Sequence, residues 1–221
     1  MSQVNPQDLW FNTPDTHTLC RAGGNGPEHP SQLYALKKYL KYGMKILDYG
    51  SGSATTWEAL KKVMGWPPGA YLGVDIIPKN VDWCKENYPE TNFEVNPSIH
   101  KIDQPDQSFD VVYSRHVVDH MEFFESAMDE HLRVAKQLVI VVFWVPLSTG
   151  DEHDIKNIVD GRGTENEKLY PNEYTNSYSR KKVMEWLDSK KEEWDLLEMT
   201  EDIGVEVKGH DWVLVLRRKN A

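Results

Sequence analysis

Short runs rich in Val, Ile and Leu alternate with helix-like segments from residue 45 onward, and this alternation constrains the fold more than any other feature. Strands that are apolar throughout must be covered on both faces, which is typical of a mainly parallel sheet flanked by helices. The expected strands are residues 45–50, 70–76, 91–96, 108–114 and 136–146, and the expected helices are residues 54–64, 78–88 and 123–134. The pattern therefore predicts an α/β fold.

The two ends of this alternating region add further elements. A helix is expected at residues 31–43, and another at residues 179–191 with Ser179 as its N-cap. The closing strands are expected at residues 194–202 and 211–219. We expect these two strands to pair in antiparallel fashion, with Gly209 at the turn between them.

Two segments lack this periodicity. Residues 1–30 are rich in Pro, Gly and Asn, and residues 147–178 are rich in Gly, Asn, Asp, Glu and Tyr. A long irregular stretch in a compact domain is often a functional loop or lid. We therefore expect an N-terminal arm or lid at residues 1–30 and a single domain at residues 31–221 that carries an insertion at residues 147–178.

The formal net charge of −10 argues against a partner that is held by its phosphates. Proteins that grip nucleic acid carry a basic stripe, and here the basic residues fall in three short clusters, residues 36–45, 180–182 and 216–219. Local basic patches can still contact RNA on an acidic protein. We expect no DNA partner, and RNA stays open as an alternative.

No feature of the sequence predicts a membrane or an oxidising compartment. The longest apolar run, residues 137–146, is shorter than the roughly 20 residues that span a bilayer. The first residues have neither the basic nor the apolar part of a secretory signal. Cys20 and Cys84 form neither a metal knuckle nor a disulfide framework. We expect a cytoplasmic protein without a membrane partner.

The segment KILDYGSGSATTWEAL, residues 45–60, has the pattern of a strand, a glycine turn and a helix. Glycines let the backbone approach a ligand closely, and the start of the helix offers free N–H groups. The next expected strand ends in Asp75, where a carboxylate can accept hydrogen bonds from ribose hydroxyls. The two features together predict an adenosine-containing ligand, and a tight turn without a ligand is the alternative.

Four stretches, LDYGSGSAT, GVDI, FEVNPS and DQSFDVVYSRHVVDHM, resemble motifs of the class I S-adenosylmethionine-dependent methyltransferases, and the resemblance spans residues 31–219. It implies a Rossmann-like, seven-stranded, mainly parallel sheet with an antiparallel last strand and helices on both faces. It also implies S-adenosyl-L-methionine as cofactor and S-adenosyl-L-homocysteine as product. The residues it assigns to the cofactor are Asp48, Gly50, Ser51, Gly52, Asp75, Ile76, Asn96, Ser98, Ser114 and Arg115.

Dinucleotide-dependent enzymes that transfer a hydride are the competing interpretation of the glycine turn. A pyrophosphate-binding loop has a third glycine for close helix packing, and here Ala54 stands near that position. The antiparallel ending resembles the methyltransferase sheet instead. Both features favour the methyltransferase interpretation.

Methyl transfer from a sulfonium is a direct displacement, so the protein mainly aligns the acceptor and removes its proton. After the fourth strand the sequence has SRHV, not the Asn/Asp-Pro-Pro-aromatic run of enzymes that methylate exocyclic amines, and a Pro-Cys nucleophile is also absent. A small-molecule acceptor, methylated at oxygen, is therefore favoured. His116 and His153 are the candidate catalytic bases, although His116 could equally be structural. His120 is expected to be a packing residue.

The acceptor pocket is expected to use aromatic residues of the two irregular segments, namely Trp10, Phe11, Tyr174 and Tyr178. These side chains could equally pin the arm and the insertion to the body. The acidic stretch at residues 150–154 is expected to be solvated, so no metal site is predicted. RNA or protein methylation, or non-catalytic binding of an adenosyl ligand, remain alternatives, and the oligomeric state is not predicted.

Overall fold

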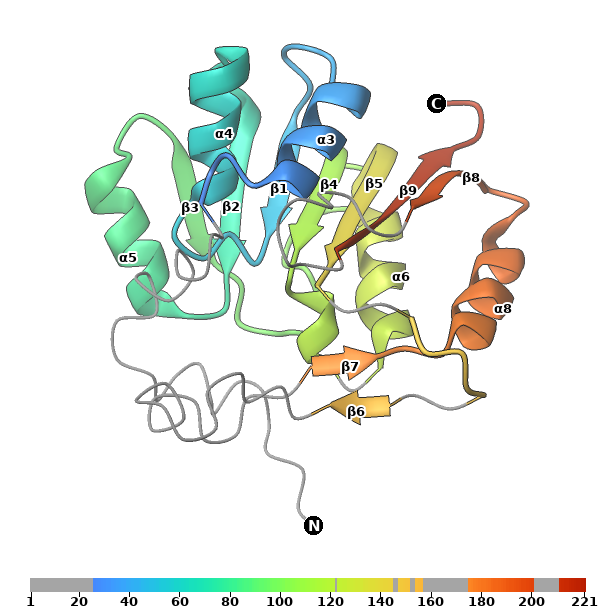
Figure 1. Ribbon diagram of the computed structural model, residues 1–221. Helices are drawn as coiled ribbons and strands as arrows, with labels where there is room; N and C mark the ends of the chain where they lie inside the picture. The colour runs from blue at the N-terminus through green and yellow to red at the C-terminus, as the bar shows by residue number, and fades with distance from the viewer. Residues whose placement is uncertain (1–25, 122, 145–146, 152–153, 157–174, 201–210) are drawn as a thin grey trace, which may run out of the picture.

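The computed structural model describes residues 26–121, 123–144, 147–151, 154–156, 175–200 and 211–221 (Figure 1). A 7-stranded sheet with the order β3-β2-β1-β4-β5-β9-β8 runs through the molecule. Its strands are β1 (Ile46–Tyr49), β2 (Tyr71–Asp75), β3 (Asn92–Val95), β4 (Phe109–Arg115), β5 (Ala135–Phe143), β8 (Trp194–Thr200) and β9 (Trp212–Arg218). Strand β9 is antiparallel to both neighbours, and the pairs among β1 to β5 are parallel. The predicted fold class is confirmed.

Helices cover both faces of the sheet, as predicted (Figure 1). They are α3 (Pro30–Tyr39), α4 (Thr55–Met64), α5 (Pro78–Asn87), α6 (Phe124–Val134) and α8 (Arg180–Lys190), with short 3-10 helices η2 (Pro68–Ala70) and η3 (Val118–His120). Ser179 caps α8, because its side chain accepts a hydrogen bond from the backbone N–H of Lys182. The helix predicted to continue to Gly43 instead ends at Tyr39, because Leu40 takes an extended conformation.

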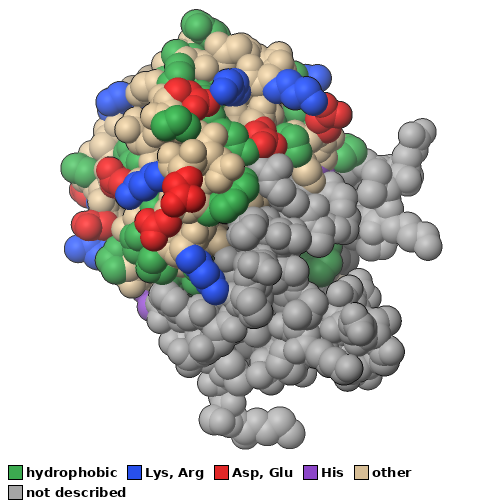
Figure 2. All heavy atoms as spheres, turned by 90° about the vertical axis from the view of Figure 1, so that its left-hand side faces the viewer, with side chains coloured by type: hydrophobic (Ala, Val, Ile, Leu, Met, Phe, Trp, Pro, Cys, Tyr) green, Lys and Arg blue, Asp and Glu red, His purple; other side chains and the backbone are tan. Residues whose placement is uncertain are grey.

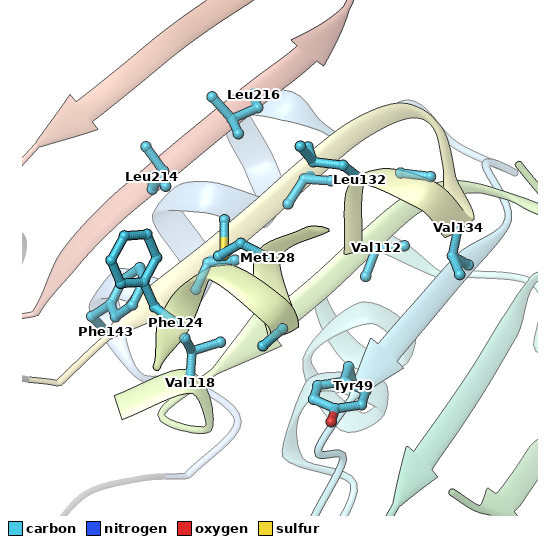
Figure 3. Packing of buried hydrophobic residues seen from close by; sticks show 14 of the residues in the cluster. Tyr49, Val112, Val118, Phe124, Met128, Leu132, Val134, Phe143, Leu214 and Leu216 are labelled. Carbon is cyan, nitrogen blue, oxygen red and sulfur yellow. The ribbon is translucent and has the colours of Figure 1, made fainter. Parts of the chain in front are cut away.

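The core has two parts, one on each face of the sheet. Buried residues of α3, α4 and α5 pack on one face, and buried residues of α6 and α8 pack on the other. Figure 3 shows the second part, where Phe124, Met128 and Leu132 of α6 lie against side chains of the central strands and of β9. From Leu138 to Phe143, successive residues of β5 alternate between the two parts, which explains why this stretch of the strand is apolar throughout.

The predicted insertion contains regular structure that its sequence does not signal. Strands β6 (Asp154–Lys156) and β7 (Thr175–Ser177) form a separate two-stranded antiparallel sheet. Both strands have only three residues, too few for a period-2 pattern to be recognised. The turn predicted at Gly209 lies outside the described residues.

The described residues contain no candidate membrane-spanning helix, and the described part of the face in Figure 2 carries charges of both signs. Among the described residues, no helix is long and apolar enough to cross a membrane. On the side that carries β3 and α5, acidic and basic side chains are interspersed wherever the surface is coloured (Figure 2). The coloured part of this face shows no basic stripe of the kind that a phosphate-binding surface would need.

Candidate functional site

The parallel strands β1, β2 and β4 end side by side, and the glycine turn lies at this edge of the sheet. Tyr49, the last residue of β1, is in register with Val74 of β2 and with Ser114 of β4. The backbone N–H groups of Gly50 and Ser51 donate to the Val74 carbonyl at 2.8 and 2.9 Å. In open α/β sheets, ligands bind at the carboxyl ends of such strands. The candidate site is therefore at this edge.

The glycine turn depends on backbone conformations that favour glycine. Gly50 and Gly52 have φ values of 76° and 51°. A Cβ added to Gly50 would lie 2.2 Å from a methyl carbon of Val117. Ala54, which directly precedes α4, also has a positive φ of 60° and gives the helix no side-chain cap. The turn thus lets the chain leave β1 tightly and presents an uncapped helix start.

Asp75 joins the end of β2 to this turn. Its Oδ2 accepts a hydrogen bond from the N–H of Gly52 at 2.8 Å, and its Oδ1 accepts one from the N–H of Ile77 at 2.9 Å. Asp75 is buried, and this burial raises its pKa although the hydrogen bonds oppose the shift. The carboxylate predicted to hold the ribose therefore lies directly against the glycine turn. Ile76 beside it is half-buried.

Asp48 lies within β1 and points into the protein interior. The Tyr71 hydroxyl donates a hydrogen bond to Asp48 Oδ2 at 2.6 Å. Burial raises the pKa of Asp48 to about 6, and the hydrogen bond from Tyr71 and the charge of Arg115 oppose this shift. Because Tyr71 is in β2, this hydrogen bond links β1 to β2.

Asn96 and Ser98 follow β3, at the position expected for the adenine. The Asn96 amide donates to the carbonyls of Ser98 and Lys101, and its Oδ1 accepts from the N–H of Asp103 at 2.9 Å. Both the nitrogen and the oxygen of the Asn96 amide thus bind backbone groups of the loop that follows β3. Ser98 is half-buried, and its hydroxyl accepts from the N–H of His100. Asn96 thus organises the loop that borders the site.

Ser114 and Arg115 end β4 beside the glycine turn. Ser114 is fully buried, and its hydroxyl has no hydrogen-bond partner within the described part of the chain. The Arg115 Nη2 lies 3.4 Å from the Thr55 hydroxyl, so the guanidinium reaches the first residue of α4. The positive charge of Arg115 therefore lies at the start of α4, close to the glycine turn.

His116, the residue after β4, belongs to a hydrogen-bonded cluster. Its Nε2 lies 3.0 Å from Asp211 Oδ2, and the Ser31 hydroxyl donates to the same oxygen at 2.5 Å. His29 Nδ1 lies 2.8 Å from the Ser31 hydroxyl. Asp211 directly precedes the antiparallel strand β9, and Ser31 lies in the first turn of α3. Three distant segments thus meet at the edge where the parallel strands end.

Burial controls the charge of this cluster. It lowers the pKa of His116 from 6.5 to about 4, against the opposing effect of Asp211. It also lowers the pKa of His29, with the positive charge of Arg115 adding to the effect. Burial of Asp211 is outweighed by its hydrogen bonds with His116 and Ser31, so its pKa is lowered. At neutral pH the cluster holds one carboxylate and two neutral imidazoles.

Comparison with known proteins agrees with this geometry. Residues 47–143 match the protein family described as a methyltransferase domain. This part of the chain is therefore similar to a methyltransferase domain, and solved structures share the fold of the chain. An S-adenosylmethionine-dependent methyltransferase from Mesorhizobium loti superposes with a TM-score of 0.63 at 15% identity, covering 87% of this chain and 100% of that chain. For magnesium protoporphyrin IX methyltransferase from Synechocystis PCC 6803 the TM-score is 0.65 at 12% identity, with 99% and 100% covered. At these identities the likeness shows the fold.

Curated relatives match only part of the domain. The ribosomal protein L11 methyltransferase of Thermosipho africanus is 37% identical over 103 residues, which cover 44% of this chain and 38% of the relative. Across four such ribosomal protein L11 methyltransferases, the match spans 24% to 38% of the relative's length. The match therefore covers less than half of the length of each of these relatives.

Of the four residues predicted to line the acceptor pocket, Tyr178 is the one that lies among the described residues. Tyr178 is buried, and its hydroxyl donates to the carbonyls of Val118 and Met121 at 2.5 and 2.6 Å. It ties the end of the insertion to η3 and does not face solvent, which fits the pinning alternative and not an acceptor contact. His120 is half-buried in η3. The remaining predicted residues, Trp10, Phe11, His153 and Tyr174, lie outside the described residues.

The sequence analysis missed three residues of the site: His29, Ser31 and Asp211. One signal was available for Asp211, because a polar residue just before an antiparallel last strand comes to the edge where the parallel strands end. Ser31 and His29 had no such signal, since the packing of α3 alone brings them there. No group of three or more potential metal ligands occurs among the described residues.

Proposed function

We propose that this protein transfers a methyl group from S-adenosylmethionine to an oxygen of a small-molecule acceptor, with His116 as the base. The observation that carries the proposal is the His116–Asp211 pair, which lies at the same sheet edge as the glycine turn. Arg115 is adjacent to His116 in sequence and reaches α4 beside that turn, so the pair borders the expected cofactor position. A base at this position suits an acceptor that loses a proton as it is methylated.

The residues of the turn fit the cofactor. Asp75 would hold the ribose hydroxyls, Ile76 would lie against the adenine, and the uncapped start of α4 would offer N–H groups to the carboxylate. The Ser51 hydroxyl is buried and has no hydrogen-bond partner among the described residues, which suits a site built for a polar ligand. Asp48 and Asn96 would act indirectly, because their side chains already bind other parts of the protein.

The reaction needs little more than alignment and removal of one proton. S-adenosylmethionine, when bound, supplies a methyl group on a positively charged sulfur. The acceptor oxygen forms the new bond to the methyl carbon, the electron pair of the broken carbon–sulfur bond stays on sulfur, and the hydroxyl proton passes to His116. Burial lowers the pKa of His116 and keeps the imidazole neutral in the neutral range, and the Asp211 carboxylate would stabilise the positive charge that the ring takes on with the proton.

Binding and turnover test the proposal in two steps. Isothermal titration with S-adenosylhomocysteine should show binding, and titration with NAD should show none. Binding of NAD alone would contradict the methyltransferase assignment. Incubation with methyl-labelled S-adenosylmethionine and a panel of phenols, carboxylic acids and amines should then label an oxygen acceptor. Labelling of amines alone would contradict the oxygen preference.

Protein methylation is the second candidate, because of the similarity to ribosomal protein L11 methyltransferases. The same labelled donor, incubated with purified ribosomal protein L11, tests it directly. Label on that protein, with none on the small-molecule panel, would replace the first proposal. Binding of S-adenosylhomocysteine without turnover on any acceptor would instead favour a non-catalytic adenosyl-ligand-binding protein.

A further inference from the structure

We infer that Asp211 is a positioning residue that fixes His116 as its Nε2–H tautomer, so that Nδ1 is the atom that accepts the proton of the methyl acceptor. Ser31 and His29 hold Asp211 in place. The inference deepens the proposed function and rests on it for the identity of the reaction. The arrangement of hydrogen bonds, however, can be tested without turnover.

In each hydrogen bond of the cluster, the chemistry of the two groups decides which one donates and which one accepts. An ionised carboxylate only accepts hydrogen bonds, so both groups that reach Asp211 Oδ2 must donate to it. Ser31 therefore gives its single hydroxyl proton to Asp211. Its oxygen then accepts from His29, whose Nδ1 lies 2.8 Å away and must carry a proton. The hydrogen bonds therefore run in one direction, because His29 donates to Ser31 and Ser31 donates to Asp211. His116 donates to the same carboxylate oxygen of Asp211.

These hydrogen bonds assign opposite tautomers to the two histidines. His116 donates through Nε2, which leaves the lone pair on Nδ1, whereas His29 donates through Nδ1. Both imidazoles are neutral at neutral pH, because burial lowers the pKa of each. The titratable and charged groups that act on His116 are Asp211, Arg115 and His29, and of these only Asp211 favours the protonated form of His116. Asp211 is thus suited to stabilise the imidazolium that proton transfer creates.

The backbone and the surrounding rings hold His116 in this position. Its φ is 56°, a left-handed conformation that is uncommon for a residue with a side chain. Its N–H donates to the Val142 carbonyl at 2.8 Å, which ties it to β5. The rings of His29 and Trp144 lie 6.0 and 6.2 Å from its own ring. The Phe143–Trp212 stack, at 4.2 Å, fixes the start of β9 next to Asp211.

A matched control exists in a second buried carboxylate that also binds α3. Glu198 of β8 accepts hydrogen bonds from Tyr34 and Lys38 of α3, at 2.5 and 2.9 Å, and from Tyr39. It resembles Asp211 in burial and in anchoring the same helix, but it has no imidazole partner among the described residues. If Asp211 served only to hold α3, then Glu198→Gln and Asp211→Ala would have the same consequences.

Nuclear magnetic resonance of protein with 15N-labelled histidine, saturated with S-adenosylhomocysteine at pH 7, reports the tautomer of each ring. The His116 signals are assigned by their loss in His116→Gln, and those of His29 by their loss in His29→Gln. We expect Nε2–H for His116 and Nδ1–H for His29 in the unaltered protein. Finding His116 as the Nδ1–H form would overturn the inference without the use of any further variant.

Three variants then separate positioning from anchoring. Asp211→Ala should shift His116 away from the Nε2–H form. Ser31→Ala should release His29 from the Nδ1–H form while His116 keeps its tautomer, and Glu198→Gln should alter neither histidine. An unchanged His116 in Asp211→Ala, or an equal change in Glu198→Gln, would contradict the role of Asp211.

Titration of the same variants separates this inference from the proposed function. Asp211→Ala should bind S-adenosylhomocysteine within about threefold of the unaltered protein, because Asp211 lies on the acceptor side. If the unaltered protein does not bind S-adenosylhomocysteine, the proposed function fails, while the tautomers measured in the free protein still decide the arrangement of the cluster. Loss of binding in Asp211→Ala alone would overturn the assignment of Asp211 to the acceptor side.

Discussion

The two halves of the site are built in different ways. On the proposed cofactor side, Gly50 and Gly52 directly follow β1, Asp75 ends the neighbouring strand β2, and hydrogen bonds from backbone N–H groups of the turn join the two. On the proposed acceptor side, Ser31 lies in α3, His116 follows β4 and Asp211 precedes β9. The cofactor side therefore depends on local chain geometry, and the acceptor side depends on the packing of the whole domain. Variants on the two sides should accordingly fail in different ways.

The largest expected effect is that of Gly50→Val on the cofactor side. The new side chain would meet Val117 at 2.2 Å and would require a φ of 76° from a β-branched residue. We expect the free energy of unfolding to fall by at least about 2 kcal/mol and binding of S-adenosylhomocysteine to be lost. Urea denaturation measures the free energy of unfolding, and isothermal titration measures the binding of S-adenosylhomocysteine. Gly69→Ala is the control, because a Cβ at Gly69 meets no atom within 4 Å; an equal loss in both variants would contradict the steric argument.

His116→Gln tests the acceptor side, with the next largest effect. Turnover of the acceptor that the labelled panel identifies should fall by about 100-fold or more, because a general base contributes at least this much. Affinity for S-adenosylhomocysteine should stay within about threefold of the unaltered protein. His100→Gln, which changes an exposed histidine, is the control for turnover. A parallel loss of affinity and turnover would show that His116 belongs to the cofactor side.

This contrast explains how much of the molecule the sequence could predict. The strands, the helices and the glycine turn follow from local patterns, and so does the position of Asp75 beside the turn. Ser31 and Asp211 have no local pattern in common, because only tertiary packing joins them. Strands β6 and β7 were missed because they are too short to show periodicity. Tyr178 belongs to an irregular stretch by sequence, yet packing buries it.

Asp75→Ala should weaken binding of S-adenosylhomocysteine by about tenfold to 100-fold, because hydrogen bonds to a charged group contribute about 1.5–3 kcal/mol. The variant removes the acceptor for the ribose and also frees the N–H of Gly52. Isothermal titration measures the change. Glu94→Gln, an exposed carboxylate on the neighbouring strand β3, should bind as the unaltered protein does. Unchanged affinity in Asp75→Ala would remove the ribose assignment.

The smallest expected effect is on the pH dependence of stability, and it is tested by comparing His131 with His116. Burial lowers the pKa of His131 to about 4, as it does that of His116, but His131 lies in the core under α6 and its Nδ1 bonds the Ala127 carbonyl. Since the unfolded chain binds these protons near pH 6.5 and the folded chain does not, each histidine stabilises the fold above pH 6.5 and loses this contribution as the pH falls toward 4.

Melting temperatures of the unaltered protein and of His131→Gln, measured from pH 7 to pH 4.5, test this contribution. The raised pKa of Asp48, about 6, acts in the opposite direction but equally in both proteins, so the comparison isolates His131. We expect the melting temperature of His131→Gln to fall less steeply with decreasing pH, whatever its value at pH 7. Equal slopes would mean that His131 already binds a proton in the folded protein. Repeating the measurement with His116→Gln should give a similar change in slope, because the pKa of His116 is also lowered to about 4, even though Asp211 opposes the shift.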